Sequence, residues 1–181
     1  MHEVAQKAAP DARVVYVDID PVAVAHSRQM LADNDAAVVF QEDLRRPEAI
    51  LNHPQLRALL DFDQPIALLM LAILHVVPDD AEPANIVARL GDELPSGSYL
   101  AISHATDESR PDVWKHLVEL SKQTPTPITP RSRAQIERFF TGFELVPPGL
   151  VWAPLWRPEA PGEVGERPER SSNYVGVGRK S

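Results

Sequence analysis

The sequence predicts an α/β fold with a mostly parallel sheet, helices on both faces and an antiparallel strand pair at its C-terminal end. Short apolar, β-rich runs alternate with helical patterns through the first eighty residues, which is typical of βαβ units. One run, residues 66–71 (IALLML), has no polar residue, as expected of a central strand covered on both faces. The last strand-like runs follow one another without a helix between them, which favours antiparallel pairing.

The first predicted strand covers residues 14–17 (VVYV), and a helix follows it. Asp20 can cap this helix, because its carboxylate accepts from the free N–H groups of the first turn. Pro21 suits the first helical position, where the N–H that proline lacks would have no partner. We expect this helix to run to about Asn34.

A second unit of the same kind begins with a strand at residues 38–40 and continues with a helical stretch that opens at Pro47. Pro54 lies inside this stretch and removes an amide donor, so it must break or restart the helix. The third unit contains the apolar run of residues 66–71 and a helix that Asp79 or Asp80 can cap. Apolar residues recur along that helix every four positions and form one stripe: Ile86, Leu90 and Leu94.

The next predicted strand covers residues 99–103 (YLAIS). An amphipathic helix comes next, marked by Val113, Leu117 and Leu120, and it must stop before the proline-rich residues 124–130 (TPTPITP). After a helix around residues 135–141, strand-like runs occupy residues 143–146, 151–152 and 174–177. We expect residues 157–172, rich in Pro, Gly and Glu, to form a mobile loop, and residues 1–181 to form a single domain.

Composition excludes several classes of function. The net charge of −8 comes without a clustered Lys/Arg stripe, so nucleic acid and anionic membranes would be repelled. The absence of Cys excludes disulfides, thiolate metal sites and a Cys nucleophile, and no His/Asp/Glu group has the spacing of a metal site. No apolar run is long enough to span a bilayer. We expect a cytoplasmic protein with a small-molecule partner, and self-association into a homo-oligomer remains open.

Acidic residues follow two successive predicted strands. In an open α/β sheet, ligands bind beyond the C-terminal ends of the strands. A carboxylate there can accept both hydroxyl hydrogens of a ribose, and Asp18 fits that role. Asp43 can accept from the exocyclic amine of an adenine while the Leu44 amide donates to a ring nitrogen, and Ile19 offers the purine an apolar face. The alternative for Asp18 is a helix cap or a surface turn.

Two histidines also follow predicted strands. His75 and His104 could act as general bases, because imidazole titrates near neutral pH. The alternative for each is a polar group that lines a pocket or satisfies a loop. We place His75 first.

The succession VVYVDIDPVAVAHSRQML, VVFQEDLRRP, IALLMLAILHVVPDD and SGSYLAISHATDE resembles a family of S-adenosylmethionine-dependent methyltransferases, class I and Rossmann-like, whose substrates are mostly unassigned. The resemblance covers nearly the whole chain. It implies S-adenosylmethionine as cofactor, with Asp18 at the ribose, Ile19 along the adenine, and Asp43 with Leu44 at the adenine edge. It also implies that Leu74 and His75 border the methionine end.

The chain departs from the family pattern at its start. Family members carry a strand and a glycine-rich turn before the segment that matches residues 2–4, whereas this sequence begins at Met1 and has no glycine before Gly91. The resemblance places that strand between those of residues 14–17 and 66–71. We expect a start site assigned too far downstream or a truncated expressed fragment, with the activity of this form in question.

Two other functions remain open on the sequence. An NAD-binding oxidoreductase also uses an acid after its second strand, although it too needs a glycine-rich turn and leaves Asp43 unexplained. The second is a binding or dimerisation module that has no catalytic activity and has lost its affinity for the cofactor. The methyl acceptor is not encoded in any recognisable motif, and residues 110–122 and 152–156 are the expected contributors to its site.

Overall fold

The computed structural model describes residues 1–181, apart from the side chain of Pro161. The chain divides into two compact units, Met1–Asp63 (unit 1) and Gln64–Ser181 (unit 2). That residues 1–181 act as a single domain stays a prediction.

Unit 1 is built on two parallel strands, β1 (Val14–Asp18) and β2 (Ala37–Gln41). The helix between them, α2 (Pro21–Met30), begins as predicted, with Asp20 Oδ1 accepting from the Val22 amide at 2.8 Å. It ends at Met30 rather than near Asn34, because the Asn34 side chain accepts from the Ala36 amide and forms a turn that leads into β2.

Helices cover both faces of the small sheet in unit 1. On one face α2 packs against alternate strand residues, in a cluster that comprises Val24, Leu31, Ala37 and Val39 with Val14 and Tyr16. On the other side Phe40 is buried and stacks on His53, at the start of α4 (Pro54–Leu59). The predicted interruption at Pro54 is confirmed, since α3 (Pro47–Leu51) ends before it. A short helix, α1 (His2–Ala8), joins the unit through a hydrogen bond from the His2 amide to the Tyr16 hydroxyl.

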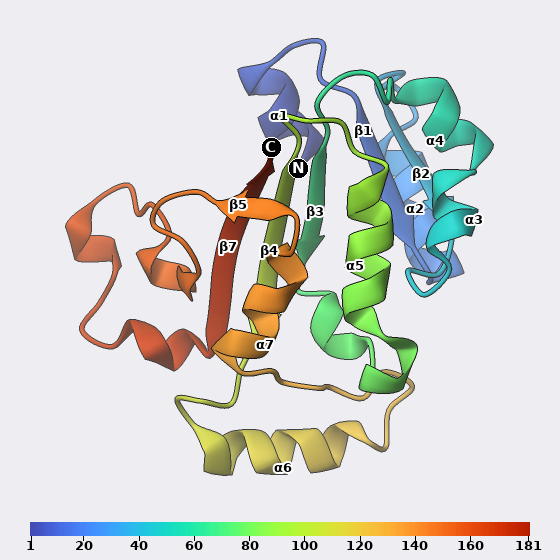
Figure 1. The fold of residues 1–181 in the computed structure, drawn as a ribbon. Coiled ribbons are helices and arrows are strands. Elements are labelled where there is room, and N and C mark those ends of the chain that lie inside the picture. Colours follow the sequence, from blue (N-terminus) through green and yellow to red (C-terminus); the bar gives the residue numbers. More distant parts are fainter. The chain divides into compact units, whose positions relative to one another are not determined.

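Unit 2 contains a mixed sheet of five strands in the order β3-β4-β7-β5, with β6 also paired to β7 (Figure 1). Its strands are β3 (Ala67–Leu71), β4 (Tyr99–Ala105), β5 (Phe143–Leu145), β6 (Val151–Trp152) and β7 (Asn173–Lys180). The β3–β4 pair is parallel, and every pair that includes β7 is antiparallel. The predicted antiparallel C-terminal end is therefore confirmed.

One face of this sheet is buried. Leu100, Ile102 and His104 alternate along β4 with no exposed surface. The helices α5 (Pro83–Asp92) and α7 (Arg133–Glu137) lie on the same face, and the 3₁₀ turn η3 (Arg138–Phe140) continues α7 (Figure 1).

The opposite face is more open, and the predicted coverage of residues 66–71 on both faces is wrong for this unit. Leu69 and Leu71 on β3 are 44% and 45% exposed. Among the described residues β3 pairs only with β4. The helices α5 and α7 cover the face of the sheet opposite to Leu69 and Leu71, so the apolar run is buried on that side alone.

The remaining segments lie outside the sheet. The helix α6 (Pro111–Ser121) lies beyond the C-terminal end of β4 (Figure 1). Residues 157–172 contain two 3₁₀ turns, η5 (Pro161–Glu163) and η6 (Pro168–Ser171), and their mobility stays a prediction. In the part of the chain that the structure describes, every helix is too short or too polar to cross a membrane.

Candidate functional site

The structure of unit 1 brings the two predicted acids to the same edge of its sheet. Asp18 is the last residue of β1 and lies opposite Gln41, the last residue of β2. The Glu42 amide donates to the Asp18 carbonyl at 3.0 Å, which holds the two strand ends together. Asp43 follows directly, so both carboxylates lie at the C-terminal end of a parallel pair, where α/β folds bind ligands.

The Asp18 carboxylate combines the two roles that the sequence left open. Its Oδ1 accepts from the Asp20 amide at 2.9 Å and thereby shapes the turn between β1 and α2. The side chain is exposed, and Oδ2 has no partner among the described residues. One oxygen therefore serves the turn and the other can accept from a hydroxyl group.

The Asp43 carboxylate is occupied by Arg45. Oδ1 accepts from the Arg45 amide at 2.9 Å and from Nε at 3.0 Å, while Oδ2 accepts from Nε at 2.9 Å and from the terminal guanidinium nitrogen at 2.5 Å. The hydrogen bonds from the Arg45 side chain lower the pKa of Asp43. A ligand amine must displace some of these contacts before Asp43 can accept from it.

Two neighbouring groups fit a purine more directly. Ile19 is 52% exposed and presents an apolar side chain beside Asp18. Gln41 Nε2 donates to the Ile19 carbonyl at 3.1 Å and fixes the backbone there. The Leu44 amide has no acceptor among the described residues, which leaves it able to donate to a ring nitrogen.

In unit 2, Leu74 and His75 lie in the 3₁₀ turn η1 (Leu74–Val76) that follows β3. Leu74 has no exposed surface, backbone included, and its carbonyl accepts from Arg131 at 2.8 Å, so Leu74 can contribute to a ligand site only from beneath, as support for the turn. His75 is half-buried, and its Nδ1 has no hydrogen-bond partner among the described residues. Burial, and then the positive charge of Arg131, lower the pKa of His75, so the ring is neutral at pH 7.

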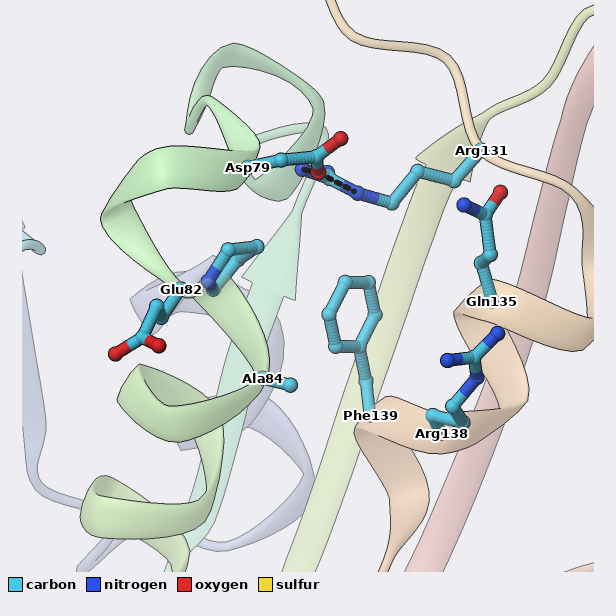
Figure 2. A pocket seen from close by; sticks show the side chains of 8 residues that line it. Asp79, Glu82, Ala84, Arg131, Gln135, Arg138 and Phe139 are labelled. Carbon is cyan, nitrogen blue, oxygen red and sulfur yellow. Dashed lines mark hydrogen bonds and ion pairs between the residues drawn. The ribbon is translucent and has the colours of Figure 1, made fainter.

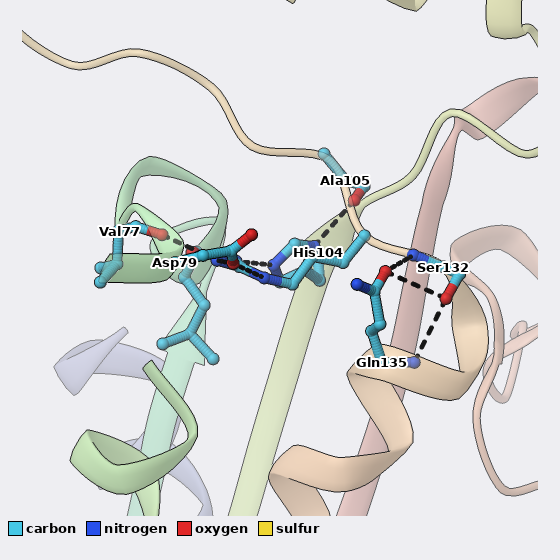
Figure 3. Close-up of polar contacts among 8 residues, drawn as sticks. Val77, Asp79, His104, Ala105, Ser132 and Gln135 are labelled. Atoms are coloured by element: carbon cyan, nitrogen blue, oxygen red, sulfur yellow. Dashed lines mark hydrogen bonds and ion pairs between the residues drawn. The ribbon is translucent and has the colours of Figure 1, made fainter. Parts of the chain in front are cut away.

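The other predicted base, His104, is fully buried at the end of β4. Its Nε2 accepts from Arg131 at 3.0 Å, and Nδ1 therefore carries the proton and donates to the Ala105 carbonyl at 2.7 Å (Figure 3). Burial lowers the pKa of His104 to about 4. Because both ring nitrogens are engaged, these contacts favour a structural role for His104 over a catalytic one.

The residue that the sequence reasoning missed is Arg131, which is only 3% exposed. It follows the proline-rich segment after α6, where an arginine would ordinarily be read as a surface residue. The structure instead directs its guanidinium toward η1, Asp79 and His104 (Figures 2 and 3). No sequence signal marks this burial, because two of the acceptors are backbone carbonyls and the other two, on Asp79 and His104, lie far from Arg131 in the sequence.

A cavity of about 210 Å³ lies beside Arg131, between the first turn of α5 and the helix α7 (Figure 2). Its walls include Glu82, Gln135, Arg138 and Phe139. The two arginines on this cavity are matched by the carboxylates of Asp79 and Glu82, so its charge selects neither an anion nor a cation.

Comparison with known proteins shows which family this chain resembles. A family model described as S-adenosyl methyltransferase matches residues 1–181. A protein of the DUF574 family from Streptomyces avermitilis is 39% identical, with a TM-score of 0.93 over 99% of this chain and 70% of that chain. A candidate methyltransferase from Thermobifida fusca is 40% identical, with a TM-score of 0.91 over 99% of this chain and 67% of that one. No curated protein matches the chain.

A more distant structure supports the fold alone. The N-methyltransferase NodS from Bradyrhizobium japonicum, in complex with S-adenosyl-L-homocysteine, is 12% identical and superposes with a TM-score of 0.58. The match covers 97% of this chain and 71% of that chain. The predicted α/β fold of class I methyltransferases is confirmed by these structures, of which this chain spans a part.

Proposed function

Because the chain belongs to the S-adenosyl methyltransferase family, we propose that it binds S-adenosylmethionine and transfers the methyl group to a small-molecule acceptor in the cytoplasm. The observation that carries the proposal is the pair of carboxylates, Asp18 and Asp43, at the C-terminal ends of two adjacent parallel strands. The adenosyl group of S-adenosylmethionine presents two hydroxyl groups and an exocyclic amine, all of which donate hydrogen bonds. Two acidic acceptors at neighbouring strand ends suit that set of donors.

Asp18 is proposed to hold the ribose. Its Oδ2 has no partner among the described residues, while the bond from the Asp20 amide to Oδ1 fixes the direction of the carboxylate. A hydroxyl that donates to a carboxylate forms a charge-assisted hydrogen bond, stronger than one between neutral groups. This preorganised acceptor requires no rearrangement of the turn when the ligand arrives.

The adenine is proposed to lie against Ile19, with Leu44 and Asp43 at its edge. Ile19 supplies exposed apolar surface, and the Leu44 amide supplies a donor. The Asp43 carboxylate can accept from the adenine amine only after it has lost some of its hydrogen bonds to Arg45. Arg45 is half-exposed, so water can replace Asp43 as its partner at a low cost in free energy.

In unit 2, Leu74 and His75 are proposed to border the methionine end, with His75 as the general base where the acceptor arrives protonated. S-adenosylmethionine would supply a methyl group on a sulfonium sulfur: the nucleophilic atom of the acceptor would attack the methyl carbon in line, and S-adenosyl-L-homocysteine would leave as the C–S bond breaks. His75 is neutral at pH 7 because its pKa is lowered, so it can take up a proton. His104 is buried with both nitrogens occupied and is not proposed as the base.

Isothermal titration of the chain with S-adenosyl-L-homocysteine, the expected reaction product, tests the proposal. The Asp18→Ala variant should bind about 10 to 100 times more weakly, since hydrogen bonds to a charged acceptor are lost. Asp33→Ala is the matched control, because Asp33 is an exposed acid in the same unit that precedes β2 and does not lie at the C-terminal end of either strand. Its affinity should equal that of the wild type.

Three outcomes oppose the proposal. Equal affinities for the wild type and Asp18→Ala would remove Asp18 from the site. Heat with NAD in place of S-adenosyl-L-homocysteine would favour an oxidoreductase. Heat with neither ligand, from a protein shown to be folded by circular dichroism, would favour a binding module without catalysis.

A further inference from the structure

We propose that Arg131 is the positioning residue of the methyl-transfer site, which holds the turn after β3 in shape by binding its carbonyl groups. The inference rests on the proposed function, because that function places Leu74 and His75 of this turn against the cofactor. Arg131 itself touches neither cofactor nor acceptor in this proposal. It acts through the turn.

The guanidinium of Arg131 uses every donor that it has. One terminal nitrogen donates to the Leu74 carbonyl at 2.8 Å and to His104 Nε2 at 3.0 Å. The other donates to the Val77 carbonyl at 2.9 Å and to Asp79 Oδ1 at 2.6 Å, and Nε reaches the same oxygen at 3.2 Å. Five N–H groups therefore meet five acceptor contacts, which only an arginine can provide.

Two of these acceptors are the carbonyls at the two ends of the turn. Leu74 opens η1, and Val77 follows its last residue. Since the guanidinium is rigid and planar, binding both carbonyls fixes the distance between them. His75 lies between these two points, so the position of its backbone depends on Arg131.

The backbone around Arg131 strengthens the same connection. The Thr129 amide donates to the His75 carbonyl at 2.7 Å, and the Arg131 amide donates to the Ala105 carbonyl at 3.2 Å. The segment after α6 is thus tied to the turn after β3 and to the end of β4. Burying a charged side chain costs free energy unless every one of its donors is paired. The complete pairing of the buried Arg131 side chain therefore supports a role in holding these segments together.

The charges around the turn are balanced asymmetrically. The Arg131 side chain is 4% exposed, whereas the Asp79 side chain that pairs with it is 71% exposed. The cation therefore lies inside while its counter-ion faces water. Arg131 donates to His104 Nε2 at 3.0 Å, and the ring centroids of His75 and His104 lie 5.7 Å apart.

Amide hydrogen exchange and ligand titration on the full chain test the proposal together. Arg131→Met keeps the volume of the side chain and removes its donors, and Arg133→Met is the matched control, because Arg133 is an exposed arginine of α7 paired with Glu137. In Arg131→Met the amides of Val76 and Val77 should exchange at least about tenfold faster. The β4–β7 ladder amides should be unaffected.

The same variant should bind S-adenosyl-L-homocysteine about tenfold more weakly, since the ligand must now order the turn. Arg131→Lys keeps the charge but has three donors, so it should restore part of the affinity and part of the protection. This partial recovery separates positioning from a general loss of stability. Should Arg131→Met unfold, Arg131→Lys carries the test, with Val76 and Val77 still exchanging faster than in the wild type.

Two results overturn the proposal. Exchange that rises equally at the turn and at the β4–β7 ladder would show that Arg131 only stabilises the unit. A loosened turn with unchanged ligand affinity would show that its shape does not matter for binding. Failure of the wild type to bind S-adenosyl-L-homocysteine would refute the proposed function and the positioning role with it, while the exchange pattern still decides whether Arg131 holds the turn.

Discussion

At the scale of single residues, Asp43 and Arg45 show how an ion pair can compete with a ligand. Among the residues that the structure describes, every hydrogen bond that the Asp43 carboxylate accepts comes from Arg45, from its amide or its guanidinium. The pair is partly exposed, with 52% of the Arg45 side chain and 21% of the Asp43 side chain accessible. Exposed ion pairs contribute about 0 to 1 kcal/mol, so binding of an adenine amine can displace this one.

Removing the competitor should therefore tighten binding. In Arg45→Gln we expect the affinity for S-adenosyl-L-homocysteine to rise by up to about fivefold, which corresponds to the free energy of an exposed ion pair. The pKa of Asp43 should rise toward its usual value, because the Arg45 hydrogen bonds that lower it are gone. Isothermal titration and an NMR titration of the carboxyl group measure the two effects. Weaker binding by Arg45→Gln would mean that Arg45 itself contacts the ligand.

The sequence predicted where the candidate site residues lie better than what they contact. Asp18 and Asp43 could be placed at strand ends, because apolar runs mark strands and acids follow them. The sequence could not predict that Asp43 pairs with Arg45, that Leu74 is completely buried or that Arg131 is buried. Each depends on side-chain direction or on backbone carbonyls, and periodicity reports neither.

At the scale of elements, strands and helices were predicted with errors at their ends. Pro54 divided two helices as expected, because it cannot donate within a helix. The helix predicted around residues 135–141 is instead α7 (Arg133–Glu137) followed by η3. It starts earlier because Ser132 and Gln135 cap each other's backbone amides, a pattern readable in the sequence that the apolar spacing did not show.

The packing of β7 depends on glycine at Gly178. A Cβ atom there would lie 2.8 Å from Phe143 Cβ and 3.0 Å from Phe140 Cδ1. Because Phe143 Cβ is attached to the backbone of β5, it cannot rotate away. We expect Gly178→Ala to lower the free energy of unfolding by about 1 to 3 kcal/mol, the usual cost of overpacking.

Urea denaturation followed by tryptophan fluorescence measures this effect. Gly162→Ala is the control, since a Cβ atom at Gly162 would meet nothing within 4 Å. Its free energy of unfolding should stay within about 0.5 kcal/mol of the wild type. Equal stability of Gly178→Ala and the wild type would mean that β5 and β7 can separate without loss.

At the scale of the whole molecule, the class of fold was predictable and the division into units was not. Alternating strands and helices predict a parallel sheet wherever they occur. They do not say which strands pair, and β2 and β3, consecutive in the chain, belong to different sheets. The boundary between Asp63 and Gln64 follows from that pairing and not from a change in composition.

The stability of unit 2 should depend on pH through its buried histidine. His104 has a pKa of about 4 in the folded protein, against a reference value of 6.5. The folded state therefore binds fewer protons than the unfolded state between these values. The part of the unfolding free energy that depends on neutral His104 is fully present above pH 6.5 and is lost as the pH falls to about 4. The loss attributable to His104 is about 3 kcal/mol.

All three tryptophans, Trp114, Trp152 and Trp156, belong to unit 2, so their fluorescence reports the unfolding of that unit alone. In His104→Gln the amide can still accept from Arg131 but does not titrate, and the decline between pH 6.5 and 5, above the range of most carboxylates, should be shallower than in the wild type. The exposed His116 provides the control, since His116→Gln removes an imidazole that lies outside the buried network. Its curve should run parallel to that of the wild type. If the His104→Gln curve did so too, His104 would not be the neutral, buried partner of Arg131 that its hydrogen bonds require.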